Sequence, residues 1–157
     1  MSGQVKLSDI IEGMESQSDE GSAYLNKKTG EVVIILDEEF RAAEDEEPIE
    51  DFPEWQCPSI KIAEEILKGD KEYIALPSKF DMHEYRIMED FCLSREVPEV
   101  SETLYRAIKG QGAFRRFKEA IHRFDITEDW YKYRDESFKQ IAKDWCEENS
   151  IEFIEDT

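Results

Sequence analysis

Apolar residues near the start of the chain follow first a helical and then a strand-like pattern. Four of them have the spacing of one helix face: Leu7, Ile10, Ile11 and Met14. This spacing predicts a short amphipathic helix. Residues 22–26 and 31–37 then indicate two strands joined by a turn that contains Gly30, so a β-hairpin is expected. Because 32–36 is apolar at every position, the second strand is predicted to be covered on both faces and central in its sheet.

The rest of the chain predicts many helices and one more strand. The strand is expected at 72–76, before Pro77. Helical patterns cover several further segments: 58–68, 81–92, 100–108, 112–125 and the region from 127 onward. A chain of 157 residues buries enough surface for one core but not for two. We therefore predict a single α+β domain over residues 1–157, with a small antiparallel sheet of about three strands packed by several helices.

The charge of the chain is strongly negative and unevenly distributed. It has 20 basic and 39 acidic residues and a formal net charge of −19 at pH 7. This charge repels phosphate backbones and anionic membranes at long range, so the whole protein does not coat nucleic acid. Segment 37–54 holds ten acids against Arg41 alone. We expect residues 38–54 to form a helical turn followed by an exposed acidic connector, because such a segment cannot bury its charge.

Basic residues concentrate in segment 105–123, where six of them accompany one acid, Glu119. At about 100° per residue, one arc of the helix 112–125 is apolar and is predicted to face the core: Phe114, Phe117, Ile121 and Phe124. The opposite arc is basic. Glycines before the helix let the backbone approach a ligand and leave N–H groups free for phosphate or carboxylate. Aromatic and cationic residues at 130–134 resemble platforms for single-stranded nucleic acid.

These patterns define one candidate ligand-binding surface and no catalytic residues. Its members are Gly110, Gly112, Arg115, Arg116, Lys118, His122, Arg123, Tyr131 and Arg134. A second interpretation stays open, because Glu119 can pair with neighbouring arginines at helical spacing. The basic surface could also dock on the chain's own segment 37–54 and act as an intramolecular clamp.

Sequence motifs for enzymes, metals and export are missing. His83 and His122 lack the spacing of metal ligands, and the glycines at 110–112 are not followed by the GK[ST] of a phosphate loop. Cys57, Cys92 and Cys146 form no CxxC pair, which fits reduced thiols, and Cys92 and Cys146 are expected on buried helix faces. We therefore expect no metal and no cofactor. The N-terminus has no apolar signal region and the chain no long apolar run, so a cytoplasmic protein without a membrane segment is predicted.

The run LYRAIKGQGAFRRFK at 104–118 contains the most specific stretch of the sequence, GQGAFRRFK at 110–118. Together with Trp130-Tyr131, with Trp145 near Asn149, and with the YLN and YIALP segments at 24–26 and 73–77, it resembles a bacterial family catalogued as uncharacterised protein family 0158. The resemblance covers nearly the whole chain. It implies a soluble bacterial protein with no established reaction and no established cofactor.

Three hypotheses for function are consistent with these patterns. The first is a non-catalytic regulatory or interaction module that binds an anionic ligand, a nucleic acid or a protein partner through the basic glycine-flanked helix 110–123. The second is an acidic protein whose 37–54 face binds a basic protein partner. The third is an enzyme of unknown reaction. Exposure of the basic residues discriminates the first hypothesis from the clamp.

Overall fold

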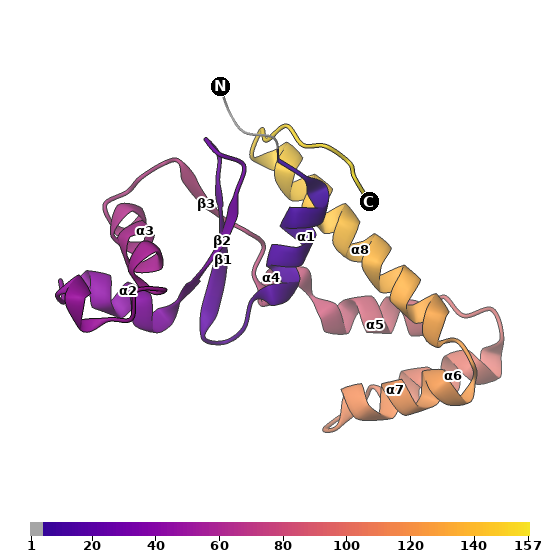
Figure 1. Ribbon diagram of the computed structural model, residues 1–157. Helices are drawn as coiled ribbons and strands as arrows, with labels where there is room; N and C mark the ends of the chain where they lie inside the picture. Colours follow the sequence, from indigo (N-terminus) through magenta and orange to yellow (C-terminus); the bar gives the residue numbers. More distant parts are fainter. Residues whose placement is uncertain (1–4) are drawn as a thin grey trace. The chain divides into compact units, whose positions relative to one another are not determined.

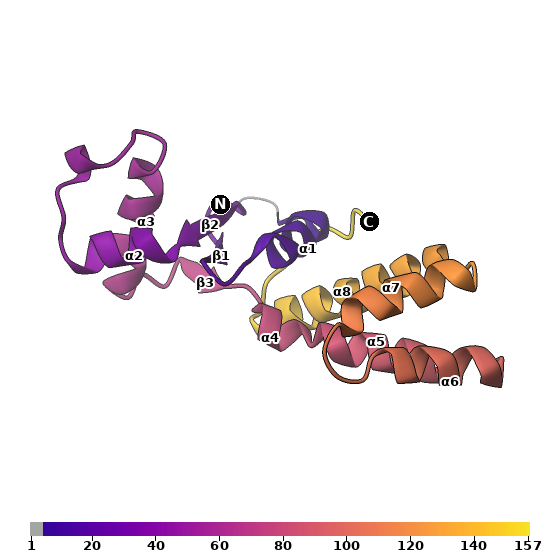
Figure 2. The same cartoon turned by 90° about the horizontal axis from the view of Figure 1, so that it is seen from below.

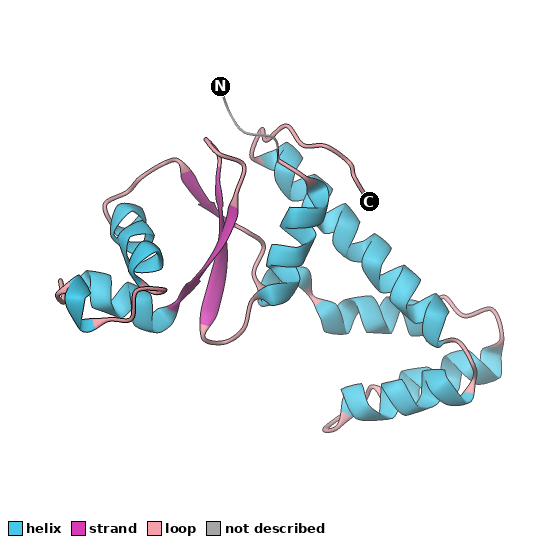
Figure 3. Ribbon diagram, in the orientation of Figure 1, coloured by secondary structure: helices cyan, strands magenta, loops and turns pink. Residues whose placement is uncertain are grey.

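Two units make up the part of the chain, residues 5–157, that the computed structural model describes. Unit 1 contains the chain up to Met82 together with Ile141–Thr157, and unit 2 contains His83–Gln140. Helices dominate, and the strands form one small antiparallel sheet in unit 1 (Figure 3). The predicted α+β class is confirmed, whereas the single domain stays a prediction. None of the described helices is long and apolar enough to cross a membrane.

Unit 1 contains the predicted helix and hairpin near the start of the chain. Its elements are α1 (Leu7–Ser16), β1 (Gly21–Asn26), β2 (Val32–Leu36), α2 (Asp37–Glu44), the short 3-10 turn η1 (Ile49–Asp51), α3 (Cys57–Leu67), β3 (Tyr73–Ala75), α4 (Lys79–Met82) and the end of α8 (Thr127–Glu148). Gly30 lies in the turn between β1 and β2, as predicted, and adopts a positive φ of 79°. Residues 37–44 of the acidic segment form α2, with Glu39 buried, and the exposed residues that follow contain only η1 before α3.

The position of β2 in the sheet differs from the prediction. The strand order is β2-β1-β3, so β1 is central and β2 is an edge strand. Both neighbours of β1 are antiparallel to it, with Ala23 opposite Ile34 and Leu25 opposite both Val32 and Ile74. The apolar run of β2 reflects helices on both faces of the strand, because α1 contacts it from one side and α2 and α3 from the other. The predicted central position was wrong because burial of two faces does not require a hydrogen-bonded neighbour at each edge.

Helices cover both faces of the sheet in unit 1. Figure 1 shows α1 on one side of the strands and α2 with α3 on the other. On the second side, Ile35 of β2 packs with small and branched residues of the two helices: Ala42, Ala43, Ile60 and Ala63. On the first side, Gly13 lets α1 approach closely, because a Cβ atom at this position would lie 2.6 Å from Cγ1 of Val32. The two apolar layers therefore give the unit its core.

In the described part of unit 1, from residue 5 onward, three polar side chains are buried, and each has a hydrogen-bond partner. Gln17 accepts the backbone N–H of Ala23 at 3.0 Å and donates to the carbonyl oxygen of Pro77 at 2.6 Å, which ties the end of α1 to the sheet. Glu39 accepts the backbone N–H of Leu36 at 2.8 Å at the start of α2. Gln56 donates to Glu38 at 2.7 Å. These hydrogen bonds offset the free-energy cost of burying the three polar side chains.

Unit 2 is helical and holds the candidate surface. It contains α5 (Glu84–Leu93), α6 (Pro98–Ala107), α7 (Ala113–Arg123) and the first part of α8. Figure 2 shows this group of helices, in which α6 packs against both α5 and α7. Its core is aromatic: the ring of Phe91 lies 5.3 Å from that of Trp130 and 6.1 Å from that of Phe117, in edge-to-face geometry. These rings fix α5, α7 and α8 relative to one another inside the unit.

Candidate functional site

The glycine-flanked turn before α7 is occupied by Arg116. Gly110 and Gly112 adopt φ angles of 78° and 76°, which turn the chain sharply between α6 and α7. The Arg116 guanidinium donates to the carbonyl oxygen of Ala107 at 2.9 Å and also to those of Lys109 and Gln111. A Cβ atom at position 112 would lie 3.2 Å from this guanidinium, so Gly112 also provides room for it. Arg116 therefore closes the end of α6 through its own side chain.

Two other arginines of the candidate surface have carboxylate partners. Arg115 lies 3.4 Å from Glu119 in an ion pair that leaves the arginine side chain 87% exposed. Arg134 donates to Glu84 at 3.1 Å and stacks over the ring of Phe138, 4.4 Å from its centroid. The predicted pairing of Glu119 with a neighbouring arginine is thus present. Arg116, by contrast, is bound to backbone carbonyl oxygens and not to carboxylates.

A cavity of about 330 Å³ opens between α5, α7 and α8 inside unit 2. We call it the α5–α7–α8 cavity. Its lining is Glu84, Met88, Phe114, Phe117, Lys118, Trp130, Tyr131 and Arg134. Phe117 and Trp130 are buried and in ring contact at 4.8 Å, so they form its apolar base. Phe114 and Tyr131 are 50% and 45% exposed.

The exposure of Phe114 corrects the sequence prediction, which placed this ring in the core with Phe117. Phe117 and Ile121 are buried as predicted, and Phe124 is half-buried. Phe114 lies in the first turn of α7, at the edge of the apolar arc next to Lys118, which is four residues later. A residue at the edge of an arc borders solvent whenever the neighbouring helices cover less than the whole arc, and here that leaves the ring beside the cavity.

Lys118 is the unpaired cation of this cavity. Its side chain is exposed, and within residues 5–157 the ammonium group of Lys118 forms no hydrogen bond or ion pair. Of the nine predicted binding residues, the cavity brings together three: Lys118, Tyr131 and Arg134. The other six do not line it: Gly110, Gly112, Arg115, Arg116, His122 and Arg123.

Sequence reasoning missed the contribution of α5 to the cavity. Glu84 and Met88 are one helical turn apart and line the same wall. Met88 belongs to the predicted helix 81–92, but nothing in the local pattern connects α5 with α7 and α8. The contact between the residues 84 and 134 spans 50 positions of sequence, and only the folded chain reveals it.

The cysteines and the acidic clusters offer little chemistry. Burial raises the pKa of Cys92 and of Cys146 to about 11, so both thiols stay protonated and unreactive near neutral pH. Cys57 is half-buried, and all three cysteines are free thiols. Within residues 5–157, no three His, Cys, Asp or Glu side chains are grouped so that they could hold a metal ion.

Charge divides sharply between the two units. Unit 1 carries 9 basic and 27 acidic residues, a net charge of −18, whereas unit 2 carries 11 and 12, a net charge of −1. The acidic segment 37–54 belongs to unit 1, where most of its carboxylates are exposed, while Glu39 and Glu38 accept hydrogen bonds from Leu36 and Gln56. An anion therefore meets strong repulsion at unit 1 and almost none at unit 2.

Comparison with known proteins identifies relatives without a described activity. The family described as "Uncharacterised protein family (UPF0158)" matches residues 4–157. A UPF0158 protein from Pseudomonas aeruginosa is 33% identical over 67 residues, which make up 42% of this chain and 44% of the relative. The matched region thus spans less than half the length of that relative. No solved structure matches this chain.

Proposed function

Since this chain belongs to the uncharacterised protein family UPF0158, whose description assigns no reaction, we propose from its geometry that it is a non-catalytic binding module. Its ligand is a small anion that carries a flat ring, held in the α5–α7–α8 cavity. This narrows the anionic ligand or partner expected from the sequence. It also moves the binding site from the glycine turn to the wall of α7 that bears Lys118.

One observation carries the proposal: an unpaired cation stands beside two half-exposed aromatic rings at an apolar-based cavity. Lys118 supplies the charge, and Phe114 and Tyr131 supply faces on which a ring can stack. The volume of about 330 Å³ lies at the lower end of small-molecule sites, the size that suits a mononucleotide or a comparable aromatic anion.

The ion pair of the cavity adds selectivity to this arrangement. Glu84 forms an ion pair with Arg134, so the wall made by α5 and α8 is close to neutral. Lys118 therefore makes the net charge of the cavity lining positive. Glu84 would repel a second anionic group placed near Arg134. We therefore expect a ligand with its charge at one end, toward Lys118, and its ring toward Tyr131.

Isothermal titration calorimetry of the full chain with adenosine monophosphate at low salt tests this proposal. Adenosine and inorganic phosphate serve as partial probes, and each is expected to bind more weakly than the nucleotide because it satisfies only one half of the cavity. Lys118→Gln should weaken nucleotide binding about tenfold, the lower end for a charge-assisted contact. Lys132→Gln removes an exposed lysine of α8 that does not line the cavity and should leave binding unchanged.

Two results would contradict the proposal. One is the absence of nucleotide binding at low salt by a protein whose melting curve is normal. The other is an equal loss of affinity in Lys118→Gln and Lys132→Gln, which would show that binding depends on total charge and not on the cavity. Tyr131→Ala gives a further check, because it should reduce affinity for adenosine as well as for the nucleotide.

A further inference from the structure

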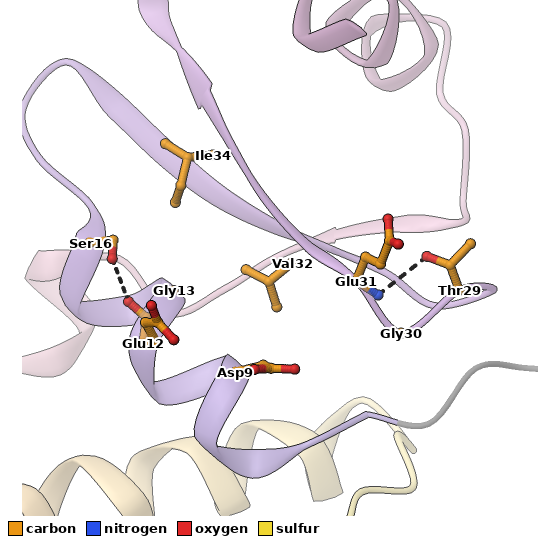
Figure 4. A pocket seen from close by; sticks show the side chains of 9 residues that line it. All are labelled: Asp9, Glu12, Gly13, Ser16, Thr29, Gly30, Glu31, Val32 and Ile34. Atoms are coloured by element: carbon orange, nitrogen blue, oxygen red, sulfur yellow. Dashed lines mark hydrogen bonds between the residues drawn. The ribbon is translucent and has the colours of Figure 1, made fainter.

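A second cavity, of about 480 Å³, lies in unit 1 between α1 and the edge strand β2. Figure 4 shows the α1 side chains Asp9 and Glu12 on one side and Val32 and Ile34 of β2 on the other, with Glu31 before the strand. We call it the α1–β2 groove. It belongs to a different unit from the α5–α7–α8 cavity, so a binding site in this groove is independent of the proposed function.

Within residues 5–157, the hydrogen-bond pattern of the hairpin leaves the outer edge of β2 without a partner strand at two residues. The N–H of Asn26 donates to Glu31 at 2.8 Å, and the N–H of Asp37 donates to Glu20 at 2.8 Å. In an antiparallel ladder the bonded residues alternate, so the odd-numbered residues of β2 face β1 and the even-numbered residues face outward. Leu36 fits this rule, because its N–H is taken by Glu39 and not by β1.

Val32 and Ile34 therefore present their backbone N–H and C=O groups at an open sheet edge. Two residues of this kind offer four main-chain hydrogen bonds to an added strand. Their side chains lie on the α1 side of the sheet, as the close approach of Val32 to Gly13 demonstrates. A chain added to this edge would thus have the apolar surface of β2 and the wall of α1 beside it.

The groove is also acidic. Asp9, Glu12 and Glu31 are exposed, and within residues 5–157 none of them takes part in an ion pair. Asp9 and Glu12 are three residues apart on α1, so their carboxylates lie on the same side of that helix. A strand that carries positive side chains complements this acidic wall. A second copy of the chain would instead be repelled, because unit 1 of each copy carries a net charge of −18.

We propose that the α1–β2 groove binds an extended basic segment of a partner protein, which adds to β2 as a fourth, antiparallel strand. Main-chain bonds to Val32 and Ile34 hold the segment. Residues opposite these two place their side chains on the α1 side, so lysine or arginine at alternate positions meets Asp9 and Glu12 of α1. Antiparallel addition continues the pattern of the existing sheet.

Amide hydrogen exchange of the full chain, with and without a capped hexapeptide that alternates lysine and valine, tests the main-chain part. In the free protein, the amides of Val32 and Ile34 should exchange faster than those of Val33 and Ile35, which face β1. Saturating peptide should slow the exchange of Val32 and Ile34 by at least about tenfold. Protection of these two amides in the free protein, or unchanged exchange at saturation, would overturn the proposal.

Backbone N-methylation of the peptide separates strand addition from simple charge attraction. Methylation of the lysines removes the N–H groups that face β2 and should abolish binding. Methylation of the valines alters N–H groups that face away and should preserve it. Equal affinity of the two methylated peptides would refute strand addition.

A matched pair of protein variants tests the acidic wall. Asp9→Asn combined with Glu12→Gln should weaken peptide binding about tenfold, because the double variant removes two contacts between exposed opposite charges. The control, Glu44→Gln combined with Glu47→Gln, removes the same charge from exposed residues outside the groove and should have a much smaller effect. An equal effect of both double variants would assign binding to total charge and overturn the site.

Discussion

Arg115 and Arg116 are neighbours in sequence and equally basic, yet the structure gives them different roles. Arg116 donates to the carbonyl oxygens of Ala107, Lys109 and Gln111, at the end of α6 and in the turn after it. Arg115 has one exposed partner, Glu119, at 3.4 Å. We therefore predict that Arg116→Gln destabilises the fold and that Arg115→Gln does not.

The magnitude depends on the exposure of the contacts. A hydrogen bond from a charged group contributes about 1.5–3 kcal/mol when it is shielded from water, but water replaces Arg116 at carbonyls that lie near the surface. A positive charge beside the C-terminus of α6 adds about 0.3–1 kcal/mol through the helix dipole. We expect a total loss of about 1–2 kcal/mol for Arg116→Gln. An exposed ion pair at helical spacing contributes about 0.5 kcal/mol or less, which is the expected loss for Arg115→Gln.

Thermal melts followed by far-UV circular dichroism measure the difference. For a chain of this size, a loss of 1 kcal/mol lowers the Tm by about 2–4 °C, so Arg116→Gln should lower it by about 2–8 °C and Arg115→Gln by about 2 °C at most. Amide exchange at 109–112 should also become faster in Arg116→Gln alone. Equal Tm values for the two variants, or a lower Tm for Arg115→Gln, would refute the conclusion that Arg116 stabilises the C-terminal end of α6.

Two further predictions concern unit 1. Gly13→Ala should destabilise the protein by about 1–3 kcal/mol in a denaturant titration, because the new Cβ would lie 2.6 Å from Val32 and 2.8 Å from Leu76. The gain in helix propensity is no more than about 1 kcal/mol and does not offset this overlap. A more stable variant would contradict the prediction and show that α1 can shift on the sheet. Hydrogen bonds from the side chain and backbone of Ser8 lower the pKa of Asp156, so its stabilising contribution is fully present above the usual aspartate pKa of about 3.9 and disappears as the pH falls through the lowered value. The reporter is the Leu7 amide, which donates to the carbonyl oxygen of Ile154 in the C-terminal segment. Asp156→Asn should speed hydrogen exchange of this amide at neutral pH but not in acid. An equal effect at both pH values would contradict this linkage.

Local sequence determined the elements and much of their orientation. The apolar spacing at Leu7–Met14 predicted α1, and the strand residues on either side of Gly30 predicted the β1–β2 hairpin. The angular arithmetic for α7 placed Phe117 and Ile121 inside and Lys118 outside, as observed. These features depend on residues within one or two turns of each other, and for that reason a periodic pattern is enough to predict them.

Tertiary structure decided which residues meet, and this no local pattern encodes. The apolar run of β2 reported two covered faces, but its place at the sheet edge results from the pairing of β3 with the far side of β1, about 50 residues later in the chain. The exposure of Phe114 depends on where the neighbouring helices end, and the cavity beside it requires α5 to meet α7 and α8. The role of Arg116 was hidden for the same reason, because its partners are backbone carbonyls whose direction is set by the positive φ angles of Gly110 and Gly112. Side-chain periodicity records burial, whereas hydrogen-bond neighbours and cavities are set by contacts distant in sequence.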